Sequence, residues 1–215
     1  MATIDIYNRA LGLLGNYDIP AGTNLTTGTS VVGVSPCNLF YPSVRQSILR
    51  DYDWNFSKYI KRYVTSDLQT VPTGEDDWDY AYNVPSDFLK ARMVKPQSAS
   101  TAYVPVDEDG GVDYEMIADG MFLTNQENPD FVYSKDITDD TLWDVLFEQV
   151  VVTLLSVKIA PLIIGESPKK MQLLWEMYKQ AKGAASLANT TDKKITVVKQ
   201  TKFLQSMKRG TRRAR

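Results

Sequence analysis

The sequence predicts an α+β fold: a helical bundle built from both ends of the chain, an inserted small antiparallel β region and an extended C-terminal arm. Three observations predict it. Apolar residues recur at helical spacing near both ends of the 215 residues, short aromatic runs separated by turn residues fill the middle, and the final segment is basic. The expected divisions are 1–56 with 135–190 for the helical body, 57–134 for the β region and 191–215 for the arm.

The first helix is expected from about Thr3 to Leu14. Its apolar residues fall on one face, Thr3 is a good capping residue, and Gly15 is suited to the helix end. The following stretch from Ala21 to Ser35 is rich in Gly, Thr, Ser and Asn, which predicts a loop.

The second helix is expected from about Pro42 to Tyr52. Proline is well accommodated at a first helical position because its missing N–H is not needed there. A helix that starts nearer Pro36 is the alternative, and it would place Pro42 inside the helix with a kink.

Short, aromatic apolar runs between Ser57 and Ser134 predict strands, and Gly- or Pro-containing turns separate them. Their spacing favours a meander of antiparallel hairpins. The candidate strands are Tyr59–Val64, Tyr80–Tyr82, Ala91–Val94, Tyr103–Val106, Val112–Met116, Met121–Leu123 and Phe131–Tyr133.

Helix is expected again from Thr138, an N-cap followed by two acidic residues that suit the helix dipole, to about Ile164. The stretch is apolar on nearly all sides, which predicts a central position. Its charged residues, Asp144 among them, favour a buried core helix over a membrane span, so no membrane partner is predicted. A last helix starts at Ser167–Pro168 and fades near Ala188.

The composition excludes several kinds of chemistry. The chain has no His and a single cysteine, Cys37, so His-based triads, His-ligated metals and an internal disulfide are excluded. The glycine spacing of Gly28–Ser35 resembles a phosphate-binding loop, but Val34 occupies the lysine position. The acidic runs Glu75–Asp79 and Asp107–Asp109 are interpreted as solvated turns. We therefore predict a protein that is not an enzyme, with no catalytic residue, metal site or cofactor.

Charge is strongly segregated along the chain. Residues 1–192 carry 15 basic and 26 acidic side chains, whereas residues 193–215 carry nine basic and no acidic ones. Apolar residues lie among these cations, which favours a segment that docks on a protein partner, in part as an added strand, over a solvated tail. The predicted docking residues are Lys193, Lys194, Ile195, Val197, Lys199, Lys202, Phe203, Leu204, Met207, Lys208, Arg209, Arg212, Arg213 and Arg215.

Three short motifs, in this order, resemble the tail tubular protein A / head-to-tail adaptor family of short-tailed bacteriophages. They are a Leu-Gly helix end, an Arg/Leu helix followed by Trp-x-Phe, and a Tyr-x-Tyr strand followed by Pro, Asp and Leu. The resemblance covers roughly residues 3–188. The residues that carry it are Leu14, Gly15, Arg45, Leu49, Trp54, Phe56, Tyr80, Tyr82, Pro85, Asp87 and Leu89.

The resemblance implies a structural virion protein. Such adaptors form a homo-oligomeric ring, usually of twelve subunits, beneath the portal protein, in the collar between capsid and tail. The ring extends the DNA channel without sequence-specific contact to the double-stranded DNA and anchors the tail nozzle or tail tube protein and tail fibres. The implied localisation is the virion tail, after synthesis in the host cytoplasm.

Two other functions remain open from the residues. A nucleic-acid-binding protein could use the basic arm, and its affinity for duplex DNA would then fall steeply with salt. A carboxylate-based cell-wall hydrolase could use two of the many acidic side chains as its catalytic pair.

Overall fold

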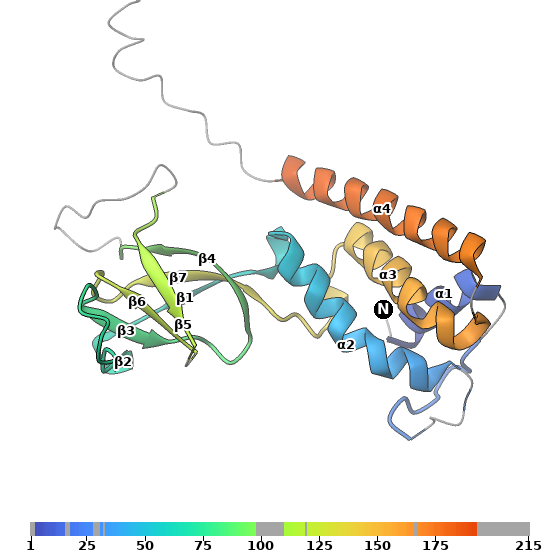
Figure 1. The fold of residues 1–215 in the computed structure, drawn as a ribbon, viewed down its shortest axis with the longest axis horizontal. Coiled ribbons are helices and arrows are strands. Elements are labelled where there is room, and N and C mark those ends of the chain that lie inside the picture. The colour runs from blue at the N-terminus through green and yellow to red at the C-terminus, as the bar shows by residue number, and fades with distance from the viewer. Residues whose placement is uncertain are drawn as a thin grey trace, which may run out of the picture.

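The computed structural model describes residues 3–15, 18–27, 31, 33–97, 110–118, 120–165 and 167–192, and it confirms a mixed α+β fold. Within these residues, four α-helices form one lobe and two antiparallel sheets form the other (Figure 1). We call them the helical lobe and the β lobe. Each has its own hydrophobic core. The predicted docking residues of the arm and the candidate strand Tyr103–Val106 lie outside the described residues.

The helical lobe is organised around one apolar helix. It contains α1 (Thr3–Gly15), α2 (Val34–Asp51), α3 (Val145–Ile164) and α4 (Pro168–Thr191). Among the described helices, α3 alone is long and apolar enough to cross a membrane, with a mean hydropathy of 1.8, and 61% of that stretch is buried inside the protein. The other three helices pack against it. An all-round apolar helix is stable in water only when neighbours cover it, so α3 sets the positions of the rest.

The second helix begins earlier than its proline suggests. Helix α2 starts at Val34, so the expected start at Pro42 is wrong and the alternative with Pro42 inside the helix is right. Gly33 precedes it with a φ of 92°, and a Cβ at this position would lie 2.7 Å from a methyl carbon of Leu11 on α1. Only glycine therefore allows the chain to enter α2 so close to α1.

The start of the third long helix also differs from the expectation. Thr138 caps no helix; a short 3-10 turn, Asp140–Leu142, comes first, and α3 begins at Val145. Asp144 is the N-cap, and its carboxylate accepts hydrogen bonds from the N–H groups of Leu146 and Phe147. The break between turn and helix lets Trp143 turn inward, where its indole N–H donates to the carbonyl of Ile137 at 3.2 Å.

The β lobe contains two small antiparallel sheets. Strand order is β1-β7-β4 in one and β2-β3-β6-β5 in the other, so the expected meander of consecutive hairpins is wrong. The central strand β7 pairs with β1 on one side and with β4 on the other. The strands are β1 (Lys58–Arg62), β2 (Leu68–Gln69), β3 (Tyr80–Asn83), β4 (Phe88–Lys95), β5 (Tyr114–Ile117), β6 (Met121–Thr124) and β7 (Asp130–Lys135).

Aromatic rings hold the two sheets together. Phe122 on β6 stacks on Phe131 on β7 with ring centroids 4.4 Å apart, and these strands belong to different sheets. Tyr63 packs edge-on against Phe122, and Tyr82 stacks on it. The burial of large rings gives this small lobe a core that short strands alone would lack.

Replacement of Gly33 with Ala should lower the free energy of unfolding by about 1–3 kcal/mol. The new side chain would meet Leu11 and would also occupy an unfavourable backbone conformation. Urea denaturation followed by circular dichroism measures the change. The matched control is Gly183→Ala in α4, where a Cβ has open space, and it should leave stability unchanged or raise it by up to about 1 kcal/mol. Equal effects of both changes would contradict the steric argument.

Candidate functional site at the junction of the lobes

The chain crosses between the two lobes twice, once after α2 and once after β7. Trp54 fills the first crossing. Its side chain is 2% exposed, its indole N–H donates to the carbonyl of Ile48 at 2.8 Å, and its ring packs edge-on against Phe147 of α3. Phe56 packs against Phe147 from a second direction. The crossing segment is therefore anchored in the core of the helical lobe.

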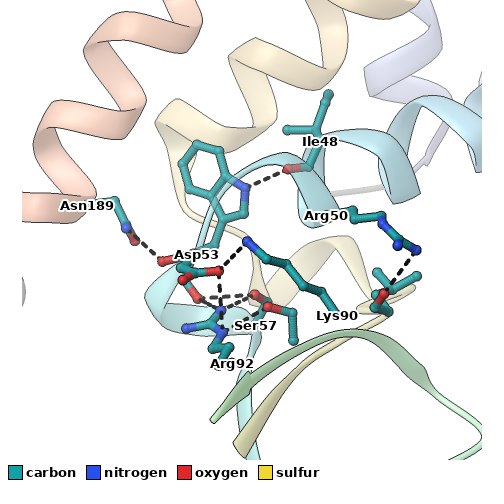
Figure 2. A network of polar contacts seen from close by, with 10 residues as sticks. Ile48, Arg50, Asp53, Ser57, Lys90, Arg92 and Asn189 are labelled. Carbon is teal, nitrogen blue, oxygen red and sulfur yellow. Dashed lines mark hydrogen bonds and ion pairs between the residues drawn. The ribbon is translucent and has the colours of Figure 1, made fainter. Parts of the chain in front are cut away.

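Arg92 of β4 reaches this crossing from the β lobe (Figure 2). Its Nη2 donates to the carbonyl of Trp54 at 2.6 Å and to the hydroxyl of Ser57 at 3.0 Å. Its Nε donates to the hydroxyl of Ser134 at 2.8 Å. One guanidinium thus joins β4, β7 and the segment that leaves α2, and its planar fork of donors suits three acceptors in fixed directions.

The pairing of β4 explains why Arg92 points there. In the register of β4 with β7, Leu89 and Arg92 are extra residues at two irregularities, between Phe88 and Lys90 and between Ala91 and Met93. A bulge redirects the side chain of the extra residue. Leu89 packs against the core of the helical lobe, and Arg92 enters the junction. Both bulges therefore attach β4 to the helical lobe.

Asp53 supplies the negative charge of the junction. Its carboxylate accepts from Nζ of Lys90 at 3.0 Å and lies 3.9 Å from Nε of Arg92. Burial lowers the pKa of Arg92 from its ordinary value, and the charge of Asp53 opposes that effect. Arg92 remains charged at neutral pH, because even a lowered arginine pKa stays far above 7.

The end of α4 is tied to the same place. Asn189 accepts from the backbone N–H of Asn55 at 2.7 Å through its side-chain oxygen, and its own amide donates to the carbonyl of Asp53 at 3.1 Å. The side-chain amide of Asn55 donates in return to the carbonyl of Asn189 at 2.8 Å. Tyr52 hydrogen bonds to the carbonyl of Ser186. The last described turn of α4, directly before the basic segment, is therefore held at the junction.

A small hollow adjoins this anchor. Its volume is about 200 Å³, and Trp54, Asp144, Asn189 and Asp192 are among the residues that line it. Asp144 and Asp192 bring two carboxylates to the point where the acidic part of the chain ends. Among the described residues, no group of three or more His, Cys, Asp or Glu side chains is placed to hold a metal ion.

A second contact lies farther along α2. Arg45 forms a two-pronged ion pair with Asp136, with both N–O distances 2.9 Å, and Gln46 donates to the same carboxylate. The backbone N–H of Asp136 donates to the carbonyl of Asp87. The carboxylate of Asp87 accepts from the hydroxyl of Tyr133 and pairs with Lys135, each at 2.9 Å. These contacts attach the segment after β7 to α2, and through Asp136 they also hold the turn before β4.

The structure brings nine of the eleven motif residues together in three groups. Leu14, Leu49, Trp54, Phe56 and Leu89 lie in or against the helical core, whereas Tyr80 and Tyr82 belong to the aromatic core of the β lobe. Arg45 and Asp87 lie in the second contact. The carbonyl of Pro85 accepts a hydrogen bond from the backbone N–H of Phe88, which closes the turn before β4. Gly15 ends α1 with a φ of 113°.

Sequence reasoning missed four polar partners at the junction, Asp53, Lys90, Arg92 and Asn189, and one in the second contact, Asp136. Arg92 carried the one usable signal, a cation inside an apolar strand candidate, because a buried arginine requires acceptors. The others look like ordinary surface residues in the sequence.

No protein-family model matches this chain, and the search of curated proteins finds no significant match.

Arg92→Leu should lower the free energy of unfolding by about 2–4 kcal/mol, because the carbonyl of Trp54 and two buried serine hydroxyls would lose a charged donor. The side chain of Arg92 is 8% exposed, whereas that of Arg62, paired with Asp130 on the surface, is 66% exposed. The matched control Arg62→Leu should leave stability nearly unchanged, because solvent screens an exposed pair. Denaturant unfolding of both variants checks this, and similar losses would show that the junction contributes no more than a surface pair.

Asp87→Asn should destabilise the fold by about 1 kcal/mol near neutral pH, and the loss should shrink in acid. Burial, the largest single influence, raises the pKa of Asp87, but hydrogen bonds from Lys135 and Tyr133 bring it below the ordinary 3.8. A lowered pKa stabilises the fold above the unfolded-state value, and that contribution disappears as the pH falls through the folded-state value.

Thermal unfolding of the Asp87→Asn variant and the unmodified chain should be compared between about pH 7 and about pH 3. Asp76→Asn, in an exposed turn, is the control and should change stability at neither pH. A difference for Asp87→Asn that persists undiminished at the acid end would contradict the assignment.

Proposed function

We propose that this protein is a structural virion component, a head-to-tail adaptor that works as a ring of identical copies beneath a phage portal. In this proposal a helical bundle built from both ends of the chain forms the body, the inserted β region projects from it, and residues 191–215 form an extended arm that docks on the portal. The motif resemblance described above supports the proposal, and the ring is expected to have twelve subunits.

The observation that carries the proposal is the anchoring of the chain where the basic segment begins. Asn189 makes three hydrogen bonds with residues 53 and 55, and Asp192 donates back to Ala188. An arm that bears load between two assemblies needs a fixed base, because a frayed helix end would extend under tension before it transmitted force. The junction network provides such a base next to both lobes.

Charge segregation supports the same function. The part of the chain before residue 193 is strongly acidic, and the following 23 residues carry nine cations. Acidic surfaces that face a channel repel DNA phosphates, so double-stranded DNA can slide past without binding. A cationic arm with apolar residues among its charges suits an acidic, partly apolar surface on the portal.

Docking of the arm is coupled to its ordering. Ordering costs conformational free energy, so a single arm should bind with modest affinity. Many arms on one ring act together, and the effective concentration of each remaining arm is high once the first has bound. The ring can therefore attach almost irreversibly although each contact is weak. The opposite side of the ring would then be available to the tail nozzle or tube protein and the fibres.

Deletion of residues 193–215 should leave a folded protein that no longer joins portal rings. The deletion keeps Asn189 and Asp192, so the anchor and both cores remain intact. Electron microscopy and co-sedimentation with purified portal rings measure attachment, and circular dichroism confirms the fold. Attachment of the truncated protein at unchanged affinity would contradict the proposal.

A second variant separates docking from simple charge attraction. Replacing Ile195, Val197, Phe203, Leu204 and Met207 with Ser keeps all nine cations, and it should also lose portal attachment. If this variant attaches normally, the arm acts through charge alone. If the full chain does not bind portal rings but binds duplex DNA with an affinity that falls steeply with salt, the nucleic-acid alternative is correct instead.

A further inference from the structure

The helical lobe has an open groove opposite α2. Helices α1 and α4 both pack on α3 but leave a space of about 570 Å³ between them. Most of its lining is small or apolar: Gly12 and Leu13 from α1, Val152 from α3, and Met177, Ala181 and Ala184 from α4. We call it the α1–α4 groove. Small side chains along such a groove permit the close approach of another helix.

The apolar surface of α4 continues beyond the groove. Leu173 is 56% exposed and Leu187 is 71% exposed. Together with Met177 and Ala184 they follow the 3- and 4-residue spacing of one helix face, and they extend over about 21 Å. Only Leu174, Ala185 and Asn189 are buried on this 24-residue helix within the described structure. Helix α4 therefore presents an apolar face that the described part of the chain leaves open.

The charges of the groove limit what can occupy it. Among the described residues no carboxylate lines it, and the one charged lining residue, Arg9, is already paired with Glu148. The remaining polar groups are the neutral side chains of Gln149, Thr153 and Gln180. A cationic segment such as residues 193–215 would find no counter-charge there, and duplex DNA would find no row of cations. The groove suits an uncharged helix surface that carries hydroxyl or amide groups.

Such a surface exists on the other side of the same lobe. From Val34 to Leu49 the sequence has one charged residue, Arg45, and it is turned inward to Asp136. The exposed residues of this stretch are Ser35, Leu39, Pro42, Ser43, Gln46 and Ser47, which we call the α2 ridge. Leu39 is 68% exposed at its centre. Depletion of charge around an exposed apolar residue is typical of interface cores.

The ridge and the groove lie on opposite flanks of α3. Phe147 packs against Trp54 and Phe56, which follow α2 in the chain. Gln149 and Val152 face the groove instead, and at about 100° per residue they lie roughly on the other side of α3 from Phe147. No α2 residue lines the groove, as far as the described residues show. In Figure 1, α2 and α4 flank α3 from different sides.

We propose that the α2 ridge of one copy inserts into the α1–α4 groove of the next copy. The ridge spans about 18 Å from Ser35 to Ser47, comparable to the apolar face of α4. The serine hydroxyls on the ridge can hydrogen bond with Gln149 and Gln180 at the groove. A contact between two different faces is heterologous, and when its rotation closes it produces a ring rather than a two-fold dimer. The inference deepens the proposed function and rests on it for closure of the ring.

Cysteine cross-linking tests the contact directly. The native Cys37 is fully buried, so the single changes Leu39→Cys and Ala184→Cys each add one accessible thiol. A short bismaleimide should join the two variants when they are mixed and should join neither variant to itself. The reaction is run on the full-length chain, alone at high concentration and with portal rings present. Cross-linking of Leu39→Cys to itself would indicate a two-fold dimer and overturn the proposal, as would absence of the mixed product under both conditions.

Charge insertion provides the second measurement. Leu39→Glu and Ala184→Glu should each weaken self-association at least tenfold in sedimentation velocity, while circular dichroism stays unchanged. Ile60→Glu is the matched control, because Ile60 is equally apolar and exposed but lies on β1, and it should have no effect. Unchanged association of both test variants would overturn the proposal.

The two proposals fail in distinguishable ways. Mixed cross-links without any attachment to portal rings would support the ridge-to-groove contact and contradict the adaptor function. Rings on the portal that lack the mixed cross-link would support the adaptor function and overturn this contact.

Discussion

The side chain of Arg92 is buried, so its guanidinium must hydrogen bond with protein acceptors, and these hydrogen bonds hold the two lobes in one arrangement. Its donors reach the carbonyl of Trp54 and the hydroxyls of Ser57 and Ser134, so the segment that leaves α2 is tied to β4 and β7. The two hydrophobic cores share no buried residue, and Leu89 of β4 is the β-lobe side chain that packs against the helical core among the described residues. Directional hydrogen bonds donated by a buried cation, together with the packing of Leu89, therefore determine how the lobes are oriented.

The apolar helix α3 imposes the second constraint. Because it is apolar on all sides, every flank must be covered, yet α1 has only 13 residues and α4 packs along a narrow stripe. The flank between α1 and α4 is left as a groove. Complete coverage would need one more helix, and the uncharged face of α2 is the matching surface that the same chain offers. Incomplete coverage of this kind is how a fold can favour association with its own copies.

The anchored end of α4 connects these features to the proposed function. The junction holds α4 at Asn189, and the same helix forms one wall of the groove. A pull on the chain beyond Asp192 would thus act on the junction and on the groove wall together. In the proposed function, ring contacts and arm docking would be mechanically connected through α4, since a packed helix moves as a rigid element.

How far the sequence alone determines this protein differs between its elements. Periodic apolar residues were enough to predict four helices and a β region between them, because burial of one face depends on local spacing. The uneven distribution of charge is likewise visible in the sequence, and it requires no coordinates. The start of α2 was not predictable from Pro42, since it depends on Gly33 fitting against Leu11 of another helix. The start of α3 depends on Trp143 reaching a carbonyl at Ile137.

The strand order and the junction were decided by the tertiary structure alone. β7 pairs with β1 across more than sixty residues of chain, and two bulges in β4 turn Leu89 and Arg92 toward the helical lobe. Asp53, Lys90, Arg92 and Asn189 come from three distant segments and have no shared pattern in the sequence. Local spacing encodes which face of an element is buried. The partner that a polar side chain finds depends on where the whole chain places it, and that information exists only in the folded molecule.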